Sequence, residues 1–303
     1  MKVLAITGDK NFKEGHPRFD LQARSVEKLS VVFWGKGYTS PKIPEEKFDV
    51  VTSQDPFWRG LFAWRTARRI GAKFNVQVHA DIPSQSFLKR LIARLVLNHA
   101  DSIRAVSQKI KEQVENTGTT TPIFVLPVYV NWEHFRKVSQ YYINKYVPDS
   151  QPTLLWLGRF EDEKDPLFAL SVFKKVYKAV PNAKLVMLGS GSLEKMLRKE
   201  AKELPIEFPG WCDSTPYLLK ARIVFSTSRA ESWGMSIVEA LSIGVPVVSP
   251  DVGIAKEAGA IVVSREKLAE TIIDTLNSNI HGELKLQLLS KEEWATEWRK
   301  TLT

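Results

Sequence analysis

The stretch that decides the fold is IVFSTSRAESWGMSIVEALSIGVPVVS, residues 223–249. It begins with an apolar, β-branched run (223–228) that is typical of a buried strand, and a short polar segment then leads to Gly234. An apolar pattern of helical period follows and ends on Gly244, directly before a second β-branched run (245–249). A strand, a helix and a strand in this order predict parallel pairing, with ligand-binding loops at the carboxyl ends of the strands.

The same alternation extends along the chain on both sides of this unit. It predicts an α/β protein with two doubly wound, Rossmann-like domains that face each other across a cleft. Strands are expected at 3–6, 30–33, 49–52, 74–78, 102–105 and 123–126, then at 153–157, 184–188, 206–208, 223–226, 246–248 and 260–263. Helices are expected at about 20–28, 57–70, 84–99 and 107–117, then at about 165–180, 192–203, 214–220, 234–243 and 265–277.

The domain boundaries follow from a break in this pattern. Residues 138–153 hold two prolines and show no clean period, which indicates an interdomain connection. We therefore expect a shortened first domain at 1–140, a linker at 141–152 and a second domain at 153–283. Within 284–303, Ser290 and Glu293 form a capping-box pattern, and an apolar stripe follows (Trp294, Trp298, Leu302). This last helix must pack on the body of the protein.

Composition excludes several classes of protein. No run approaches the 18 or so apolar residues of a membrane-spanning helix, and Met1–Gly8 is typical of a first strand rather than a signal peptide. A single cysteine, Cys212, and only five histidines argue against disulfides and a structural zinc site. We expect a cytoplasmic protein without a bound metal.

The net charge of +9 lies entirely in the first half of the chain. Residues 1–140 hold 22 Lys and Arg against 13 Asp and Glu, whereas the two signs balance in 141–303. The cations cluster in two predicted helices, 57–70 (Arg65, Arg68, Arg69) and 84–99 (Lys89, Arg90, Arg94). One interpretation is a surface that attracts anionic lipid, nucleic acid or phosphorylated substrates. The other is that the apolar faces are domain core and the cations are merely solvated.

Two glutamates flank the predicted helix start in the opening stretch. Glu231 lies in the loop after a strand, and Glu239 lies two helical turns further on. The backbone N–H groups between them could bind a diphosphate, because small residues there permit close approach. The carboxylates could then accept hydrogen bonds from sugar hydroxyls. The alternative interpretation is that Glu231 caps the helix and Glu239 is solvated.

Two further segments of the second half have the chemistry of a phosphate site. Gly158 ends a strand, and Arg159 and Lys164 follow it at a spacing that could let both cations meet a diphosphate. Gly189 and Gly191 end the next strand, and Ser192 after them is expected to cap the helix that follows. The third glycine and the acidic residue of a dinucleotide fingerprint are missing. An NAD site is therefore not expected, and neither an Asp-x-Asp metal motif nor a pyridoxal-phosphate signature is evident.

The order Gly-Arg-x4-Lys, Gly-x-Gly and Glu-x7-Glu resembles glycosyltransferase family four, whose members are retaining enzymes of two-domain GT-B architecture. The resemblance is specific over residues 153–303. It implies that Glu231 contacts the donor hexose, that Glu239 binds the ribose, and that Arg159 and Lys164 bind the diphosphate. The implied donor site also includes Gly158, Gly189, Gly191, Ser232, Trp233, Gly234, Met235 and Ser236.

The first half resembles the family less fully. The segments 52–56, 77–81 and 105–107 are similar to family landmarks, and the matching histidine of relatives, here His79, lies beside the transferred sugar. We therefore expect His79 to act with Glu231 in catalysis. Relatives often carry a Gly-Gly loop near the donor phosphates, where this chain has only Gly8. The helix containing Trp294 and Trp298 resembles one that crosses back to the first domain.

The functional hypothesis is a retaining, metal-independent hexosyltransferase. Its co-substrate is a nucleoside-diphosphate sugar, it needs no further cofactor, and its acceptor is a hydroxyl of a lipid-linked or cell-envelope glycan. The expected location is the cytoplasm, at the cytoplasmic face of an anionic membrane, with contacts through residues 57–70 and 84–99; nucleic acid is not an expected partner. The alternative is a catalytically inactive binding or regulatory protein of the same fold, which could bind nucleic acid or membrane through its basic first domain. The short first domain, its basic charge and the missing Gly-Gly loop would favour this alternative.

Overall fold

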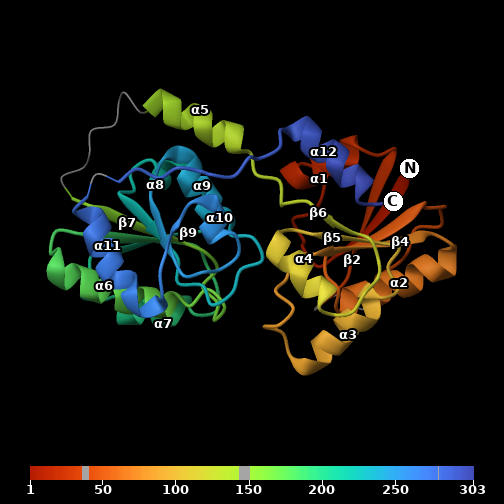
Figure 1. Cartoon of the computed structure of the whole chain (residues 1–303), viewed down its shortest axis with the longest axis horizontal. Coiled ribbons are helices and arrows are strands. Elements are labelled where there is room, and N and C mark those ends of the chain that lie inside the picture. The colour runs from red at the N-terminus through yellow and green to blue at the C-terminus, as the bar shows by residue number, and fades with distance from the viewer. Residues whose placement is uncertain (36–40, 143–150, 279) are drawn as a thin grey trace. The chain divides into compact units, whose positions relative to one another are not determined.

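A computed structural model describes residues 1–35, 41–142, 151–278 and 280–303. The chain divides into two compact units (Figure 1). The first comprises Met1–Tyr129 together with Leu289–Thr303, and the second comprises Val130–Leu288. Each unit is an α/β layer structure around one parallel sheet, as the alternation of strands and helices predicts.

The first unit is built on a parallel sheet of order β2-β1-β3-β4-β5-β6. Its central strands are buried on both faces, and three of them carry buried polar residues, such as Thr52 on β3, Gln77 on β4 and Arg104 on β5, as well as apolar ones. Helices α1 and α12 lie on one face and α2 and α3 on the other (Figure 1). The strands are β1 (Lys2–Thr7), β2 (Lys28–Phe33), β3 (Val50–Ser53), β4 (Lys73–Val78), β5 (Ser102–Ala105) and β6 (Ile123–Val125). The helices are α1 (Pro17–Arg24), α2 (Trp58–Ile70), α3 (Phe87–Leu97), α4 (Gln108–Glu115) and α12 (Lys291–Lys300).

The second unit repeats the layout with sheet order β12-β11-β10-β7-β8-β9. Its sheet is also parallel, and its core includes the fully buried Trp156, Phe160 and Phe173. The strands are β7 (Thr153–Leu157), β8 (Lys184–Leu188), β9 (Ile206–Gly210), β10 (Ile223–Phe225), β11 (Val247–Ser249) and β12 (Ile261–Val262). The helices are α5 (Trp132–Tyr142), α6 (Pro166–Ala179), α7 (Glu194–Glu200), α8 (Thr215–Leu218), α9 (Met235–Ile243), α10 (Ala255–Ala258) and α11 (Leu268–Leu276), with a 3₁₀ turn at Arg265–Lys267.

The C-terminal helix α12 belongs to the core of the first unit. The predicted capping box is confirmed: Ser290 and Glu293 each accept a hydrogen bond from the other's backbone N–H. Trp294 and Trp298 are buried against the first sheet, and Trp294 Nε1 donates to the Pro127 carbonyl at 2.8 Å. The apolar stripe at the end of the sequence is therefore the inner face of a packed helix.

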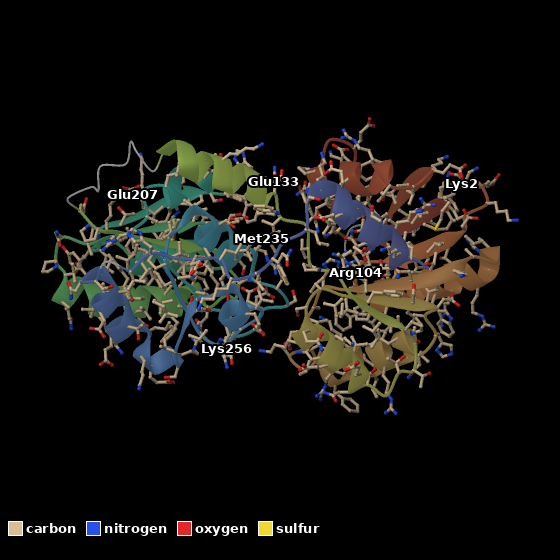
Figure 2. The ribbon with its side chains drawn as sticks, turned by 45° about the horizontal axis from the view of Figure 1, so that its top comes forward. Lys2, Arg104, Glu133, Glu207, Met235 and Lys256 are labelled. Carbon is tan, nitrogen blue, oxygen red and sulfur yellow. The ribbon has the colours of Figure 1, made fainter. Side chains whose placement is uncertain are left out.

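A buried arginine ties this helix to the sheet. Arg104 on β5 lies within the first unit (Figure 2). It donates to the Leu126 and Pro127 carbonyls and to Gln77 Oε1, and its guanidinium lies 5.1 Å from the Trp294 ring centre. Burial, with a smaller contribution from Arg18, lowers the Arg104 pKa to about 9. The side chain therefore remains a cation at neutral pH, inside the unit.

Two predicted element boundaries are wrong. The first helix spans Pro17–Arg24 rather than 20–28, because Pro17 starts it, His16 caps it, and strand β2 already begins at Lys28. The predicted break at 138–153 is helical through Tyr142, because α5 is an amphipathic helix that packs on α9. Residues 143–150 of the predicted linker lie outside the described residues.

Candidate functional site

The candidate site is built on the loop that leads from β10 into α9. Strand β10 is fully buried, and the loop after it ends at Gly234, whose φ is +107°. The helix begins at the next residue, Met235. Glycine suits the position of Gly234 because an L side chain is strained at positive φ. The helix closes on Gly244, also at positive φ, and β11 follows. The predicted strand–helix–strand unit is thus confirmed.

Glu231 is held by two neighbours in this loop. Its carboxylate accepts a hydrogen bond from Ser228 Oγ at 2.8 Å and forms an ion pair with Lys164 Nζ. Both charged side chains are mostly buried, with 18% of Lys164 and 14% of Glu231 exposed. A charge pair in this environment is screened less by salt than a surface pair. The fold therefore brings together two predicted site residues that are 67 positions apart.

Arg159 occupies a different position from Lys164. It forms an ion pair with Glu163, and 61% of its side chain is exposed. Both cations lie on the loop between β7 and α6, but they contact different carboxylates. Of these two cations, only Lys164 contacts Glu231. That both meet one diphosphate remains a prediction.

The glycines after β7 and β8 permit these two loops to touch. A Cβ on Gly189, at φ +145°, would lie 1.8 Å from the Gly158 carbonyl oxygen, and one on Gly191 would lie 2.5 Å from the Phe160 carbonyl oxygen. The backbone joins the loops further, since Phe160 N–H donates to the Ser190 carbonyl. The Gly-x-Gly segment is therefore required by close backbone packing, whatever ligand it meets.

Ser192 is not the N-cap that its position before a helical pattern suggests. Its N–H and hydroxyl donate to the two carboxylate oxygens of Glu161, at 2.9 and 2.6 Å, and Leu193 precedes α7 instead. These hydrogen bonds favour the ionised form and lower the Glu161 pKa. The prediction failed because a partner 31 residues away competes for the serine side chain.

Glu239 on α9 meets the loop after β9. Its carboxylate accepts a hydrogen bond from Ser214 Oγ at 3.2 Å. Burial of the carboxyl group raises the Glu239 pKa to about 7, because desolvation and the nearby Asp213 outweigh the Ser214 hydrogen bond. The glutamate is therefore not simply a solvated helical residue, and it changes charge near neutral pH.

The loop after β11 closes over the start of α9. Gly253 has φ +55°, and a Cβ there would lie 2.2 Å from the Trp233 carbonyl oxygen and 2.9 Å from Glu231 Cβ. The same carbonyl accepts a hydrogen bond from Ile254 N–H at 2.9 Å. Trp233 is buried, and its Nε1 has no hydrogen-bond partner among the described residues. These contacts fix the backbone that carries Glu231.

A neighbouring cluster of charged side chains was not predicted from the sequence. Asp165 caps α6 in a left-handed conformation (φ 49°) and pairs with Arg229 and Arg265. The two arginines line a cavity of about 450 Å³ together with Ser228 and residues 250–252. The Asp165-Pro166 pair is a helix-start signature that could have located the aspartate. No local signal points to the arginines, which are 64 and 100 positions away.

His79, the remaining predicted catalytic residue, lies in the first unit at the carboxyl end of β4. Its Nε2 atom is buried and has no hydrogen-bond partner in the part of the chain that the structure describes. Burial, followed by the charges of Arg104 and Arg18, lowers the His79 pKa well below its usual value. The imidazole is therefore neutral at physiological pH, with one ring nitrogen unsatisfied.

Gly8 lies in the first unit, after β1. A Cβ on this residue would lie 2.2 Å from a guanidinium nitrogen of Arg59. Its place is thus explained by the packing of that arginine, which the sequence analysis did not single out.

Family models match both halves of the chain. Residues 16–128 match the glycosyl transferase 4-like domain, and residues 151–278 match glycosyl transferases group 1. Poly(glycerol-phosphate) alpha-glucosyltransferase of Bacillus subtilis is 30% identical over 162 residues, which cover 48% of this chain and 24% of that protein. Alpha-monoglucosyldiacylglycerol synthase of Streptococcus pneumoniae is 23% identical over 261 residues, which cover 76% of this chain and 59% of that protein. The chain thus spans less than two thirds of the length of these curated relatives.

Solved structures share the fold at low sequence identity. HepE of Anabaena, in complex with UDP and glucose, superposes with a TM-score of 0.74 at 14% identity, over 100% of this chain and 95% of that one. TarM of S. aureus, in complex with Fondaparinux, alpha-GlcNAc-glycerol and UDP, has a TM-score of 0.66 at 15% identity, over 84% and 55% of the two chains. With its two parallel-sheet units and its Glu-x7-Glu loop, the chain belongs to glycosyltransferase family four and has the GT-B fold.

Proposed function

We propose that this glycosyltransferase moves a hexose from a nucleoside-diphosphate sugar to a hydroxyl of a lipid-linked or cell-envelope glycan, with retention of configuration and without a metal. The observation that carries the proposal is the Lys164–Glu231 pair beside the start of α9. It combines a cation and backbone N–H groups, which suit a diphosphate, with a carboxylate that can accept sugar hydroxyls.

The charge that builds on the leaving diphosphate sets the main chemical demand. Lys164 and the first N–H groups of α9, from Gly234 to Ser236, can offset this charge at little cost in reorganisation, because the fold already fixes them. Glu231 would orient the hexose by accepting hydrogen bonds from its hydroxyl groups. The Arg159 side chain is long and exposed, so it would add a bidentate contact to the diphosphate once it leaves Glu163.

Only the leaving phosphate and His79 are proposed to act on the acceptor side of the reaction. The leaving phosphate would take the acceptor proton on the same sugar face, which gives retention without a protein nucleophile. The neutral His79 would place its unsatisfied Nε2 beside the transferred sugar as a hydrogen-bonding group. The relatives named poly(glycerol-phosphate) alpha-glucosyltransferase and alpha-monoglucosyldiacylglycerol synthase support a lipid or envelope acceptor.

An anionic membrane is the proposed surface on which the acceptor is met. Helix α3 has two apolar faces: Ile92, Ala93, Val96 and Leu97 are buried, whereas Phe87, Leu88, Leu91 and Leu95 are 43–68% exposed. Exposed cations lie beside the outer face (Arg90, Arg94) and on α2 (Arg65, Arg68, Arg69). An exposed apolar row flanked by arginines is the pattern of an interfacial helix on anionic lipid. No helix in the described part of the chain is both long and apolar enough to span a bilayer.

The first prediction concerns transfer itself. Glu231→Ala should lower turnover of a nucleoside-diphosphate hexose by at least about a hundredfold, because the carboxylate orients the reacting sugar. Release of nucleoside diphosphate from UDP-, GDP- and ADP-hexoses, with and without EDTA, measures it. The exposed Glu270→Ala on α11 is the matched control and should keep full activity. Unchanged turnover in Glu231→Ala would contradict the proposal, and inhibition by EDTA would contradict metal independence.

The second prediction concerns Glu239. A carboxylate binds both ribose hydroxyls better than a carboxylic acid does, and the Glu239 pKa is about 7 before ligand binds. Nucleotide affinity should therefore rise about tenfold from pH 6 to pH 8 through this group. Calorimetric titrations with Glu239→Gln supply the comparison, since titration of the diphosphate itself is common to both proteins. Parallel pH profiles for the two proteins would contradict the role of Glu239.

The third prediction concerns the membrane. Arg90→Glu with Arg94→Glu should abolish binding to vesicles that contain phosphatidylglycerol, because both charges would then be repelled. Co-sedimentation with these vesicles and with pure phosphatidylcholine vesicles measures the effect. Lys174→Glu with Lys175→Glu on α6 makes the same change of charge on exposed residues of the second unit and should leave binding intact. An equal loss of vesicle binding in both double variants would show only a net-charge effect and would contradict the role of the α3 surface.

A further inference from the structure

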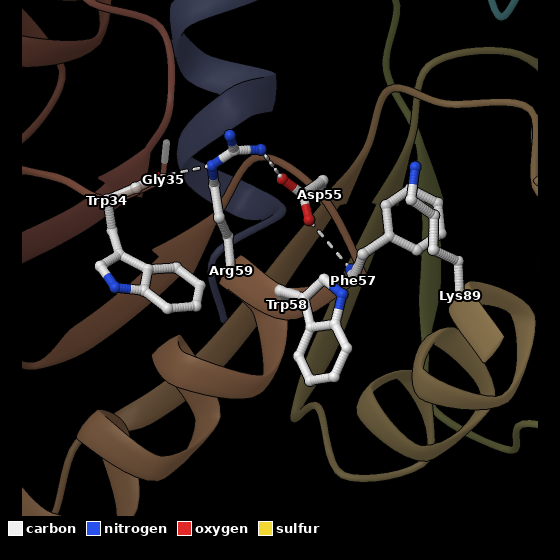
Figure 3. A pocket seen from close by; sticks show the side chains of 7 residues that line it. All are labelled: Trp34, Gly35, Asp55, Phe57, Trp58, Arg59 and Lys89. Atoms are coloured by element: carbon white, nitrogen blue, oxygen red, sulfur yellow. Dashed lines mark hydrogen bonds and ion pairs between the residues drawn. The ribbon is translucent and has the colours of Figure 1, made fainter. Parts of the chain in front are cut away.

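A second cavity of about 450 Å³ lies in the first unit, at the carboxyl ends of β2 and β3 and the start of α2 (Figure 3). Parallel sheets present ligand-binding loops at this edge. The cavity wall includes Trp34, Asp55, Trp58, Arg59 and Lys89. None of these residues belongs to the donor site proposed above, so the cavity needs its own explanation.

Arg59 is fixed in the cavity wall from several sides. Its Nε donates to the Trp34 carbonyl at 2.8 Å, and its Nη1 donates to Asp55 Oδ2 at 2.7 Å. The guanidinium also packs where Gly8 and Gly35 have no side chains, since a Cβ on either would lie within 3.0 Å of Nη2. Three loops after β1, β2 and β3 therefore converge on one preorganised arginine.

Lys89 supplies the net charge of the cavity. Asp55 compensates Arg59, whereas no carboxylate in the described ranges forms an ion pair with Lys89. Its Nζ donates a hydrogen bond to the neutral Gln85 Oε1 at 3.1 Å and lies 5.6 Å from the Phe57 ring centre. A lysine without a carboxylate partner, in a cavity whose arginine is already paired with Asp55, is suited to an oxyanion such as phosphate.

Trp58 gives the cavity an apolar wall. Its ring is 49% exposed although it stands at the first position of α2, where it lines the same cavity as Lys89 (Figure 3). By contrast, Trp34 is already stacked on Phe62, with ring centres 5.0 Å apart. A half-exposed aromatic face in a cavity with an uncompensated lysine can pack the C–H groups of a polyol or sugar while the lysine holds its phosphate.

We infer that this cavity binds a phosphorylated polyol or sugar of the acceptor, with the phosphate at Lys89 and the carbon skeleton against Trp58. The inference rests on the proposed function and adds the chemical class of the acceptor. A neutral glycan would leave the Lys89 charge without a role. The phosphate could belong to a lipid headgroup or to a soluble phosphate-containing polymer, and both present the same chemistry to these residues.

The test is calorimetric titration of the whole chain with sn-glycerol 3-phosphate, inorganic phosphate and glycerol. Glycerol 3-phosphate should bind more tightly than the other two probes. Lys89→Gln should weaken its binding about tenfold, which is the loss of one charge-assisted hydrogen bond. Trp58→Ala should weaken the binding of glycerol 3-phosphate but not that of inorganic phosphate. Lys73→Gln, at the exposed amino end of β4, is the matched control and should bind as the unaltered protein does.

The outcomes separate this inference from the proposed function. Equal affinity for glycerol 3-phosphate and phosphate, or no effect of Lys89→Gln, would overturn the inference, while UDP binding and hexose transfer would still stand. Lys89-dependent binding in a chain that transfers no hexose would instead support the cavity and sink the proposed function. Displacement of glycerol 3-phosphate by phosphatidylglycerol vesicles would identify a lipid headgroup, and displacement by a soluble glycerol-phosphate oligomer would identify a polymer. Displacement by neither would overturn the assignment to an acceptor.

Discussion

The ion pair between Lys164 and Glu231 is the interaction on which the proposed donor site depends. It joins the loop after β7 to the loop after β10, and these two strands are neighbours in the second sheet. Both side chains are mostly withdrawn from solvent, so loss of either would leave a poorly solvated charge. The close contact of Gly253 with the Glu231–Trp233 backbone fixes the same segment from the other side. The result is a carboxylate and a cation held in place before any ligand arrives.

The sequence predicts the scaffold of both units because parallel, doubly covered strands leave a strong pattern. Each predicted strand overlaps an observed one, since short apolar and β-branched runs mark the strands even where β4 and β5 carry buried polar residues. Helix ends were less predictable. Ser192 hydrogen-bonds Glu161 rather than capping α7, and α5 replaces part of the expected linker. In each case a tertiary contact decides the boundary, and a local pattern cannot report it.

The candidate site divides in the same way. Glu231, Lys164 and Gly234 were identified from motif spacing, and the fold does bring Glu231 to Lys164. The raised pKa of Glu239 could not be predicted, because it arises from burial against the loop after β9. The cavity around Arg59 was equally hidden, since it forms from Gly8, Gly35 and Asp55 on three separate loops. Residues that act through convergence of loops leave no local signal.

The central claim is that Glu231 recognises the donor sugar while Lys164 recognises its phosphates. The most direct measurement compares calorimetric affinities for a nucleoside diphosphate and for the same nucleotide carrying its hexose. The account predicts that the unaltered protein prefers the sugar nucleotide, and that Glu231→Ala binds both ligands equally. Lys164→Ala should weaken both ligands together. A preference for the sugar nucleotide that survives in Glu231→Ala would contradict the account.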